Sequence, residues 1–123
     1  MLVDTNILIL YLNGDEAIAQ TLSEWKLSGK IFYISSISRA EVLSGFNLTD
    51  AEISNAAIWL EENFISISFD DKIADIAGQI RRGYKLKLPD AGIAATSIIS
   101  NNPLLTRNIK DFKKVKELTI VSI

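Results

Sequence analysis

The stretch Met1-Leu2-Val3-Asp4-Thr5-Asn6-Ile7-Leu8-Ile9-Leu10-Tyr11-Leu12 decides the fold class of this chain. Its first three residues are typical of a short buried strand, and residues 4–6 supply polar capping side chains for the apolar run that follows. The stretch therefore predicts a strand that leads directly into a helix. Such a unit is the usual beginning of a parallel α/β sheet.

The rest of the chain repeats this alternation. Further strands are expected at residues 31–34, 65–68, 104–106 and 118–123. Helical spacing of apolar residues fills the intervals, over residues 17–27, 37–46, 50–64, 71–83 and 89–100. Gly83 is the expected end of its helix, and residues 107–111 are expected to form a polar turn. The order favours a single three-layer α/β/α domain over residues 1–123, with a parallel sheet covered by helices on both faces.

Composition narrows the chemistry available to the chain. Its 123 residues, 48% of them hydrophobic, suit one globular domain. With no cysteine and no histidine, it lacks thiolate metal ligands, cysteine nucleophiles and the commonest general base. A net charge of −2 argues against coating nucleic acid by bulk charge. No apolar run reaches the roughly 18 to 20 residues of a membrane span. The strand at residues 1–3 leaves no room for a secretory leader, so a cytoplasmic location is expected.

Acidic residues stand where strands end or helices begin, at Asp4, Glu41, Asp90 and Asp111. Taken singly, each has a capping explanation, because acids near a helix N-terminus satisfy free N–H groups and complement the helix dipole. Ser38 and Glu41, for example, have the spacing of a capping box. Taken together, these acids are expected at one edge, because parallel strands all end on the same side of a sheet.

Crowding these acids has an electrostatic cost that capping does not offset. Two like charges 4 Å apart repel by roughly 4 kcal/mol at an effective dielectric of 20, whereas a helix cap contributes about 1 kcal/mol. A divalent cation reverses this balance, since Mg²⁺ and Mn²⁺ prefer carboxylate oxygens. We therefore expect the set to bind such an ion. Asp70 and Asp71 also open a helix, but we interpret them as an ordinary cap and solvated surface.

Four ordered segments carry a family resemblance. They are Leu2-Val3-Asp4-Thr5-Asn6-Ile7-Leu8, Ile37-Ser38-Arg39-Ala40-Glu41-Val42-Leu43-Ser44-Gly45, Leu88-Pro89-Asp90-Ala91-Gly92-Ile93-Ala94-Ala95-Thr96 and Leu105-Thr106-Arg107-Asn108-Ile109-Lys110-Asp111-Phe112. In this order and spacing they resemble the motifs of PIN-domain ribonucleases. Among these, the chain is most similar to VapC-type toxins of bacterial and archaeal toxin–antitoxin pairs.

The resemblance has implications for fold, activity and partners. It implies a parallel sheet of strand order 3-2-1-4-5 with an acidic pocket at its carboxyl edge. It implies an endoribonuclease that uses Mg²⁺ or Mn²⁺ to hydrolyse RNA phosphodiester bonds, leaving a 5′-phosphate and a 3′-hydroxyl. It also implies a homodimer and a cognate antitoxin whose C-terminal segment blocks the acids.

The family's site residues transfer position by position. Asp4, Glu41 and Asp90 match its most constant acids, and Asp111 matches a less constant fourth. Asp4, Asp90 and Asp111 are the implied metal ligands, while Glu41 completes the shell or helps to deprotonate the attacking water. Polar positions that border the site are matched by Asn6, Ser38, Thr106 and Asn108. Whether Asn108 or Asp111 reaches the metal stays open.

Substrate binding and rival functions complete the sequence-based expectations. Arg107 is the basic residue most expected to bind RNA, because it adjoins the fourth acid.

The alternative to a nuclease is a PIN-like module that binds RNA or protein without cutting. A haloacid-dehalogenase-like phosphatase is disfavoured, because it would need a second acid where Asn6 stands. Large aromatic residues on helical patterns, interpreted as core with a partner surface as the alternative, are Trp25, Phe46, Trp59 and Phe64.

Overall fold

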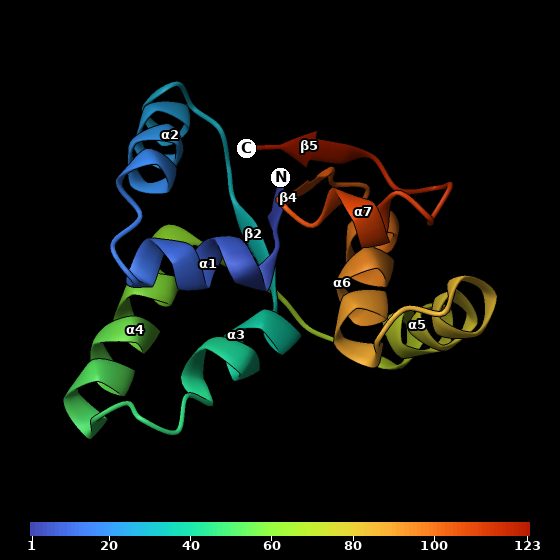
Figure 1. Cartoon of the computed structure of the whole chain (residues 1–123), viewed down its shortest axis with the longest axis horizontal. Helices are drawn as coiled ribbons and strands as arrows, with labels where there is room; N and C mark the ends of the chain where they lie inside the picture. The colour runs from blue at the N-terminus through green and yellow to red at the C-terminus, as the bar shows by residue number, and fades with distance from the viewer.

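The computed structural model describes residues 1–123, and its strands and helices alternate along the chain (Figure 1). The strands are β1 (Leu2–Val3), β2 (Tyr33–Ser35), β3 (Ile65–Ile67), β4 (Leu104–Thr106) and β5 (Ile120–Ser122). The helices are α1 (Thr5–Leu12), α2 (Glu16–Leu27), α3 (Ser36–Leu43), α4 (Asp50–Asn63), α5 (Asp71–Tyr84), α6 (Leu88–Ile99) and α7 (Ile109–Phe112). No helix among them combines the length and apolar character needed to cross a membrane.

All the strands belong to one parallel sheet, in the order β3-β2-β1-β4-β5. The central strand is β1, where Leu2 lies opposite Tyr33 of β2 and opposite Leu104 of β4. The chain winds from β1 towards β2 and β3, and later returns to the other side of β1 through β4 and β5. An α/β sheet has its ligand crevice outside the carboxyl ends of the strands at such a switch point. This order confirms the predicted arrangement 3-2-1-4-5.

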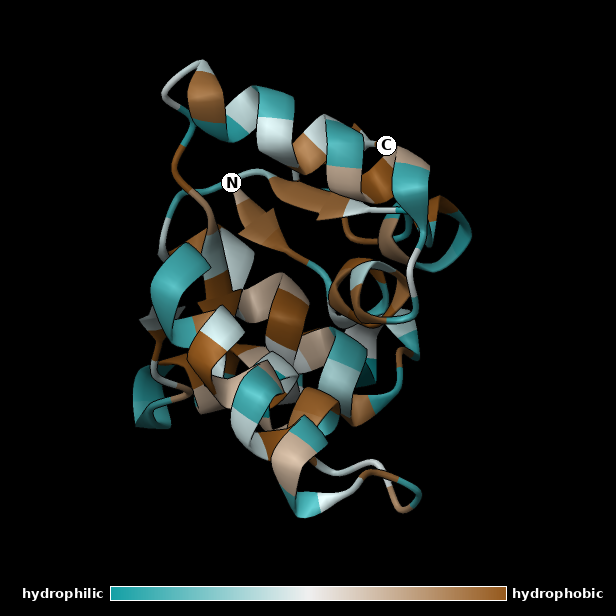
Figure 2. Cartoon of the chain, turned by 90° about the vertical axis from the view of Figure 1, so that its left-hand side faces the viewer, coloured by the Kyte–Doolittle hydropathy of each residue, from teal (hydrophilic) through white to brown (hydrophobic).

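Adjacent residues of the central strand face opposite helical layers, as the pleat of a strand requires. Leu2 is buried in a cluster with Ile73 of α5 and Ala94 of α6, whereas Val3 is buried in a cluster with Leu8 of α1 and Leu60 of α4. Figure 1 accordingly shows α1 to α4 on one side of the sheet and α5 and α6 on the other. In Figure 2 the strands are hydrophobic, while the helices around them carry both hydrophilic and hydrophobic residues.

The aromatic residues have different environments. Trp59 stacks on Tyr11 with ring centroids 4.5 Å apart and meets the edge of Phe64 at 5.1 Å, which confirms that both predicted residues belong to the core. Trp25 is half-buried against the same cluster. Phe46, in contrast, is fully exposed. The prediction of a core position was wrong for Phe46, because α3 has already ended and the residue lies in the turn that follows.

Two further local expectations were wrong. Helix α5 does not end at Gly83 but continues to Tyr84, and Lys85 then takes a left-handed conformation with a φ of 58°. Tyr84 packs against the core, which favours this additional helical residue. The predicted polar turn at residues 107–111 contains the start of α7. Phe112 is fully buried in the cluster beneath it, and its burial holds the segment in a helical turn.

Candidate functional site

Asp4 is a buried carboxylate at the carboxyl end of the central strand. Its backbone N–H donates to the carbonyl oxygen of Leu105 at 2.9 Å, and its side chain accepts a 2.7 Å hydrogen bond from the hydroxyl of Thr106. The residue precedes α1, but its side chain makes no capping bond. Only 2% of Asp4 is exposed, and burial raises its pKa to about 6, against the opposing effect of the Thr106 hydrogen bond. Capping therefore does not explain this acid.

Asp90 connects the acids electrostatically. It lies in the first turn of α6, after Pro89. Burial is the main cause that raises its pKa, and the negative charges of Glu41 and Asp111 raise it further, while Lys87 lowers it. Asp90 and Glu41 in turn raise the pKa of Asp4. The sheet and helices thus bring the other three predicted acids within electrostatic reach of Asp90.

Glu41 is held towards Asp4 by a hydroxyl pair. The Thr5 hydroxyl lies 2.8 Å from Oε1 of Glu41 and 2.8 Å from Oγ of Ser38. Because Thr5 has a single hydroxyl proton, it donates to the carboxylate and accepts from Ser38. The alternative explanation of Ser38 and Glu41 as a capping box does not hold: α3 starts earlier, and its cap is Ser35, which accepts from the N–H of Ile37 at 3.1 Å. Ser38 is instead a buried polar residue between two helices.

Asp111 lies in α7 and is held by two residues close to it in sequence. The amide of Asn108 donates to Oδ2 of Asp111 at 3.2 Å, and the Lys114 ammonium lies 3.7 Å from Oδ1. The backbone N–H of Asn108 donates to the Thr106 hydroxyl oxygen at 2.9 Å, which joins this group to Asp4. The Asn108 amide reaches the carboxylate of Asp111 and makes no capping bond. Asn108 is therefore placed to orient Asp111.

Gly92 allows the helices that carry Glu41 and Asp90 to approach closely. A Cβ at this position would lie 2.3 Å from Cδ1 of Ile37 in α3 and 3.3 Å from Cε2 of Phe69. Helices α3 and α6 pack against each other at this point. A side chain on residue 92 would require the terminal methyl of Ile37 to shift, so the missing Cβ lets Ile37 of α3 pack closely on α6.

The donor set suits a hard divalent cation. Its charged groups are all carboxylates, and burial, with their mutual repulsion as a smaller cause, raises the pKa of Asp4 and of Asp90. A cation beside them would relieve this repulsion. No three acidic side chains stand at metal-ligand spacing in this structure. Glu41 and Asp111 are instead hydrogen-bonded to Thr5 and Asn108, so side-chain rotation would have to accompany ion binding.

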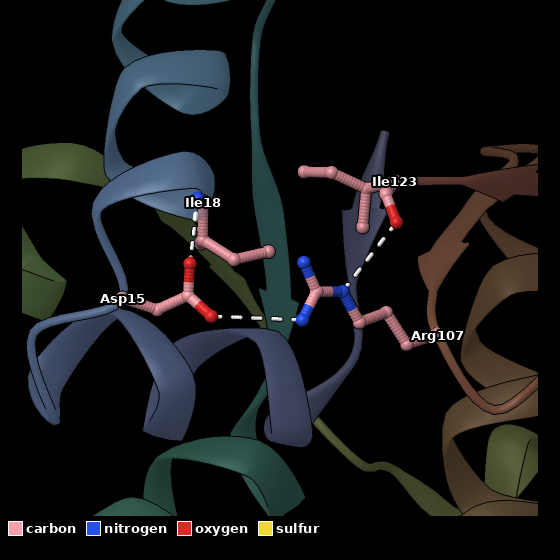
Figure 3. Close-up of polar contacts among 4 residues, drawn as sticks. All are labelled: Asp15, Ile18, Arg107 and Ile123. Carbon is pink, nitrogen blue, oxygen red and sulfur yellow. Dashed lines mark hydrogen bonds and ion pairs between the residues drawn. The ribbon is translucent and has the colours of Figure 1, made fainter.

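Arg107 and Asn6 lie beside the acids. Both line an open hollow of about 530 Å³ together with Ile9, Leu10 and Asn108. Figure 3 shows the Arg107 guanidinium between Asp15 and the main-chain oxygen of Ile123. An apolar cavity of about 140 Å³ is lined in part by Tyr11, Trp59 and Phe64. None of the four acids lines either space, but the hollow adjoins the acidic group through Asn108, which is bonded to Asp111.

Sequence reasoning missed two residues at this edge. Thr5 holds Glu41, and Asp15 faces Arg107. The signal for Thr5 was its position directly after Asp4, at the point where the first strand becomes a helix. No pattern in the sequence connects Asp15 with Arg107, because they lie on different elements far apart in the chain.

A parallel sheet of order 3-2-1-4-5 with carboxylates grouped at its switch point defines an α/β protein with an acidic site at its carboxyl edge. The sequence matches the PIN domain family over residues 1–118. It is 30% identical over 122 residues to Ribonuclease VapC19 of Mycobacterium tuberculosis, and the match covers 95% of each protein. The chain therefore belongs to the PIN domain family, and its similarity is to members of VapC type.

Solved structures agree with this assignment. One similar structure is a toxin–antitoxin complex from Klebsiella pneumoniae, with a TM-score of 0.81, 34% identity, and coverage of 99% of this chain and 98% of that chain. Another is VapBC2 from Rickettsia felis bound to a DNA fragment from their promoter, with a TM-score of 0.84, 26% identity, and coverage of 99% and 97%. Both likenesses extend over essentially the whole of this chain.

Proposed function

We propose that this protein is a divalent-metal-dependent endoribonuclease that acts as the toxin of a toxin–antitoxin pair. The observation that carries the proposal is the buried Asp4 carboxylate, whose pKa is raised to about 6 by burial and by the charges of Asp90 and Glu41, against the Thr106 hydrogen bond. A fold that needed only capping would not keep this charge buried beside two others. The relatives named Ribonuclease VapC19 support cleavage of RNA.

The acids divide into two roles in the proposed reaction. Asp4, Asp90 and Asp111 would hold one or two ions of Mg²⁺ or Mn²⁺ through their carboxylate oxygens. Such an ion would supply positive charge at the phosphodiester and make the attacking water more acidic. Glu41, which is exposed and is held by Thr5, accepts a proton from that water. The water oxygen bonds to phosphorus as the bond to the 3′-oxygen breaks, and the departing oxygen takes a proton from solvent, which leaves a 5′-phosphate and a 3′-hydroxyl.

The polar residues around the acids hold these groups in position. Thr106 orients Asp4, and Asn108 orients Asp111, each by a hydrogen bond to one carboxylate oxygen. Ser38 supports Thr5 from within α3. Asn6 is exposed beside the site, at the rim of the hollow where a nucleotide would lie.

Partners follow from the same proposal. The similar structures from Klebsiella pneumoniae and Rickettsia felis are toxin–antitoxin complexes, which supports a cognate antitoxin for this chain. A homodimer is proposed from the resemblance to VapC-type toxins. An RNA substrate and an antitoxin partner would both be met in the cytoplasm.

The test is cleavage of structured RNAs by the purified protein in Mn²⁺ and in EDTA. Asp90→Asn removes one charge from the acidic group, and Asp70→Asn is its matched control. Asp70 caps α5 by accepting from the N–H of Ile73 at 2.9 Å, and asparagine is an equally good cap. We expect Mn²⁺-dependent cuts that Asp90→Asn abolishes and Asp70→Asn leaves intact, with circular dichroism showing both variants folded. Binding without cleavage by the unmodified chain would identify a non-cleaving PIN-like module instead.

A further inference from the structure

Arg107 lies between two residues whose side chains donate hydrogen bonds to the acidic group. The residue before it, Thr106, donates to Asp4 at 2.7 Å, and the residue after it, Asn108, donates to Asp111 at 3.2 Å. Both neighbours fix the backbone of Arg107 beside the proposed cleavage site. Its side chain is 43% exposed and so is accessible to a ligand at this edge.

The guanidinium group of Arg107 is held by long contacts. Nη1 lies 3.6 Å from Oδ2 of Asp15, and Nε donates to the main-chain oxygen of Ile123 at 3.4 Å (Figure 3). Charge-assisted hydrogen bonds are usually nearer 2.8 Å, and Nη2 has no partner in the protein. The cation thus faces the Asp15 carboxylate and the Ile123 oxygen but is not tightly bonded to either. A ligand with two anionic oxygens would bind it better, because the planar group offers paired donors.

Asp15 is fixed independently of Arg107. It is the cap of α2, where its Oδ1 accepts from the N–H of Ile18 at 3.0 Å (Figure 3). Its side chain is only 26% exposed. The carboxylate is therefore held by its cap bond and stays in place when Arg107 turns away.

The hollow beside Arg107 has the size and lining for a nucleotide. Its volume of about 530 Å³ lies within the range of small-molecule sites. Asn6 and Asn108 contribute amides, Ile9 and Leu10 contribute apolar surface, and Arg107 contributes the cation. Asn108 lines the hollow and is bonded to Asp111, so the hollow lies beside the acids, and a strand bound at the acids would have this hollow and Arg107 next to it.

We infer that Asp15 is the counter-ion that masks Arg107 in the free protein, and that an RNA phosphate must displace it from the guanidinium during binding. This inference rests on the proposed function and assigns Asp15 a role in setting RNA affinity. Asp15 contacts no substrate itself but acts through Arg107. When a phosphate replaces Asp15 at the guanidinium, Asp15 is left unpaired in the complex. The contact between Arg107 and the phosphate therefore contributes less to RNA binding than the same contact from an arginine without a counter-ion would.

The inference predicts an effect on salt dependence. When a side-chain cation without a counter-ion contacts a phosphate, salt ions are released from the nucleic acid. In this protein the Asp15 carboxylate left unpaired by RNA binding takes up a salt cation, which cancels part of that release. Asp15→Asn keeps the α2 cap but removes the competing charge. The plot of log K against log salt should therefore steepen by up to roughly 0.7, the value for one phosphate contact on a single strand.

The experiment measures binding of a fluorescein-labelled single-stranded RNA of mixed sequence by anisotropy, in EDTA so that no cleavage occurs. We expect Asp15→Asn to tighten binding about two- to fivefold at low salt, the scale of one exposed ion pair. Arg107→Gln should weaken it. Adding Asp15→Asn to Arg107→Gln should change affinity no more than Asp70→Asn does, because the effect passes through Arg107. With Mn²⁺ present, the effect of Asp15→Asn should fall on KM for cleavage rather than on kcat.

Several results would overturn the inference. One such result is weaker or unchanged RNA binding by Asp15→Asn. Another is that Asp15→Asn tightens RNA binding equally in the Arg107→Gln background, since this would be a general charge effect. These outcomes are separate from the proposed function, which fails if the unmodified chain does not cut RNA in Mn²⁺. A chain that cuts RNA while Asp15→Asn behaves like Asp70→Asn keeps the proposed function and refutes the role of Asp15.

Discussion

The hydroxyl of Thr106 donates a 2.7 Å hydrogen bond to Oδ2 of Asp4, and both side chains are buried. The residues are 102 positions apart in sequence and meet because β1 and β4 are neighbours in the sheet. This bond favours the charged form of Asp4 and opposes the effect of burial on its pKa. It therefore keeps the central carboxylate available for a cation.

Thr106→Val should raise the pKa of Asp4 further above about 6, because valine keeps the shape of threonine without its hydroxyl. The change also removes the acceptor of the Asn108 N–H, so we expect the free energy of unfolding to fall by about 1–3 kcal/mol. Carboxyl ¹³C NMR titration and urea denaturation would measure the two effects. Thr96→Val is a suitable control, since the Thr96 hydroxyl is also buried but donates to the carbonyl of Gly92. An unchanged Asp4 pKa in Thr106→Val would contradict the prediction.

Asp4→Asn should change how stability depends on pH in EDTA. The pKa of Asp4 in the folded chain is about 6, above its ordinary value of 3.8, so the folded chain binds more protons between these values and loses stability as pH rises through them. Relative to the unmodified chain, we expect Asp4→Asn to gain on the order of 2–3 kcal/mol between pH 4 and pH 7. Urea denaturation at both pH values provides the measurement. Parallel stability curves for the two proteins would show that the Asp4 pKa is not raised.

Thr5→Val should slow RNA cleavage about tenfold, because Glu41 loses the hydroxyl that orients it. Thr5→Ser keeps a hydroxyl at the same place and should restore most of the rate. The measurement is kcat at saturating RNA in Mn²⁺, with thermal melting to confirm that both variants are folded. If serine were as slow as valine, packing of the methyl group rather than the hydrogen bond would be responsible.

Gly92→Ala should lower the free energy of unfolding by about 1 kcal/mol, since overpacking costs about 1–3 kcal/mol and alanine recovers about 1 kcal/mol in helix propensity. The clash is with Cδ1 of Ile37, the atom that Ile37→Val removes. We therefore expect the double variant to be more stable than the sum of the single effects predicts. Urea denaturation of the unmodified chain, the two single variants and the double variant would measure this double-mutant cycle. Strictly additive changes in the free energy of unfolding would place the strain elsewhere, as at Phe69.

Much of the fold could be predicted from local patterns. The alternation of strand and helix and the Asp70 cap appear in the structure. Errors fell where packing opposes a local signal. Gly83 is a good helix stop, yet the contacts of Tyr84 continue the helix, and the polar turn near Asp111 becomes helical through Phe112.

The candidate site was predictable as a set of acids but not as a set of contacts. Asp4, Glu41, Asp90 and Asp111 were found because strands and helices of a parallel sheet meet at one edge. Their catalytic and metal-binding roles stay predictions. The capping explanation for Ser38 and Glu41 was reasonable locally, but the cap at Ser35 shifts the start of α3 and turns Ser38 towards Thr5.

The sequence by itself determined the α/β class, the central position of its first strand through the family resemblance, and the identity of the charged groups, because these depend on periodicity and residue type. Only the tertiary structure decided which hydroxyl serves each carboxylate and that Asp15 faces Arg107. Such pairings join elements far apart along the chain. They depend on how the helices are placed against the sheet, and this placement arises from the packing of the whole core.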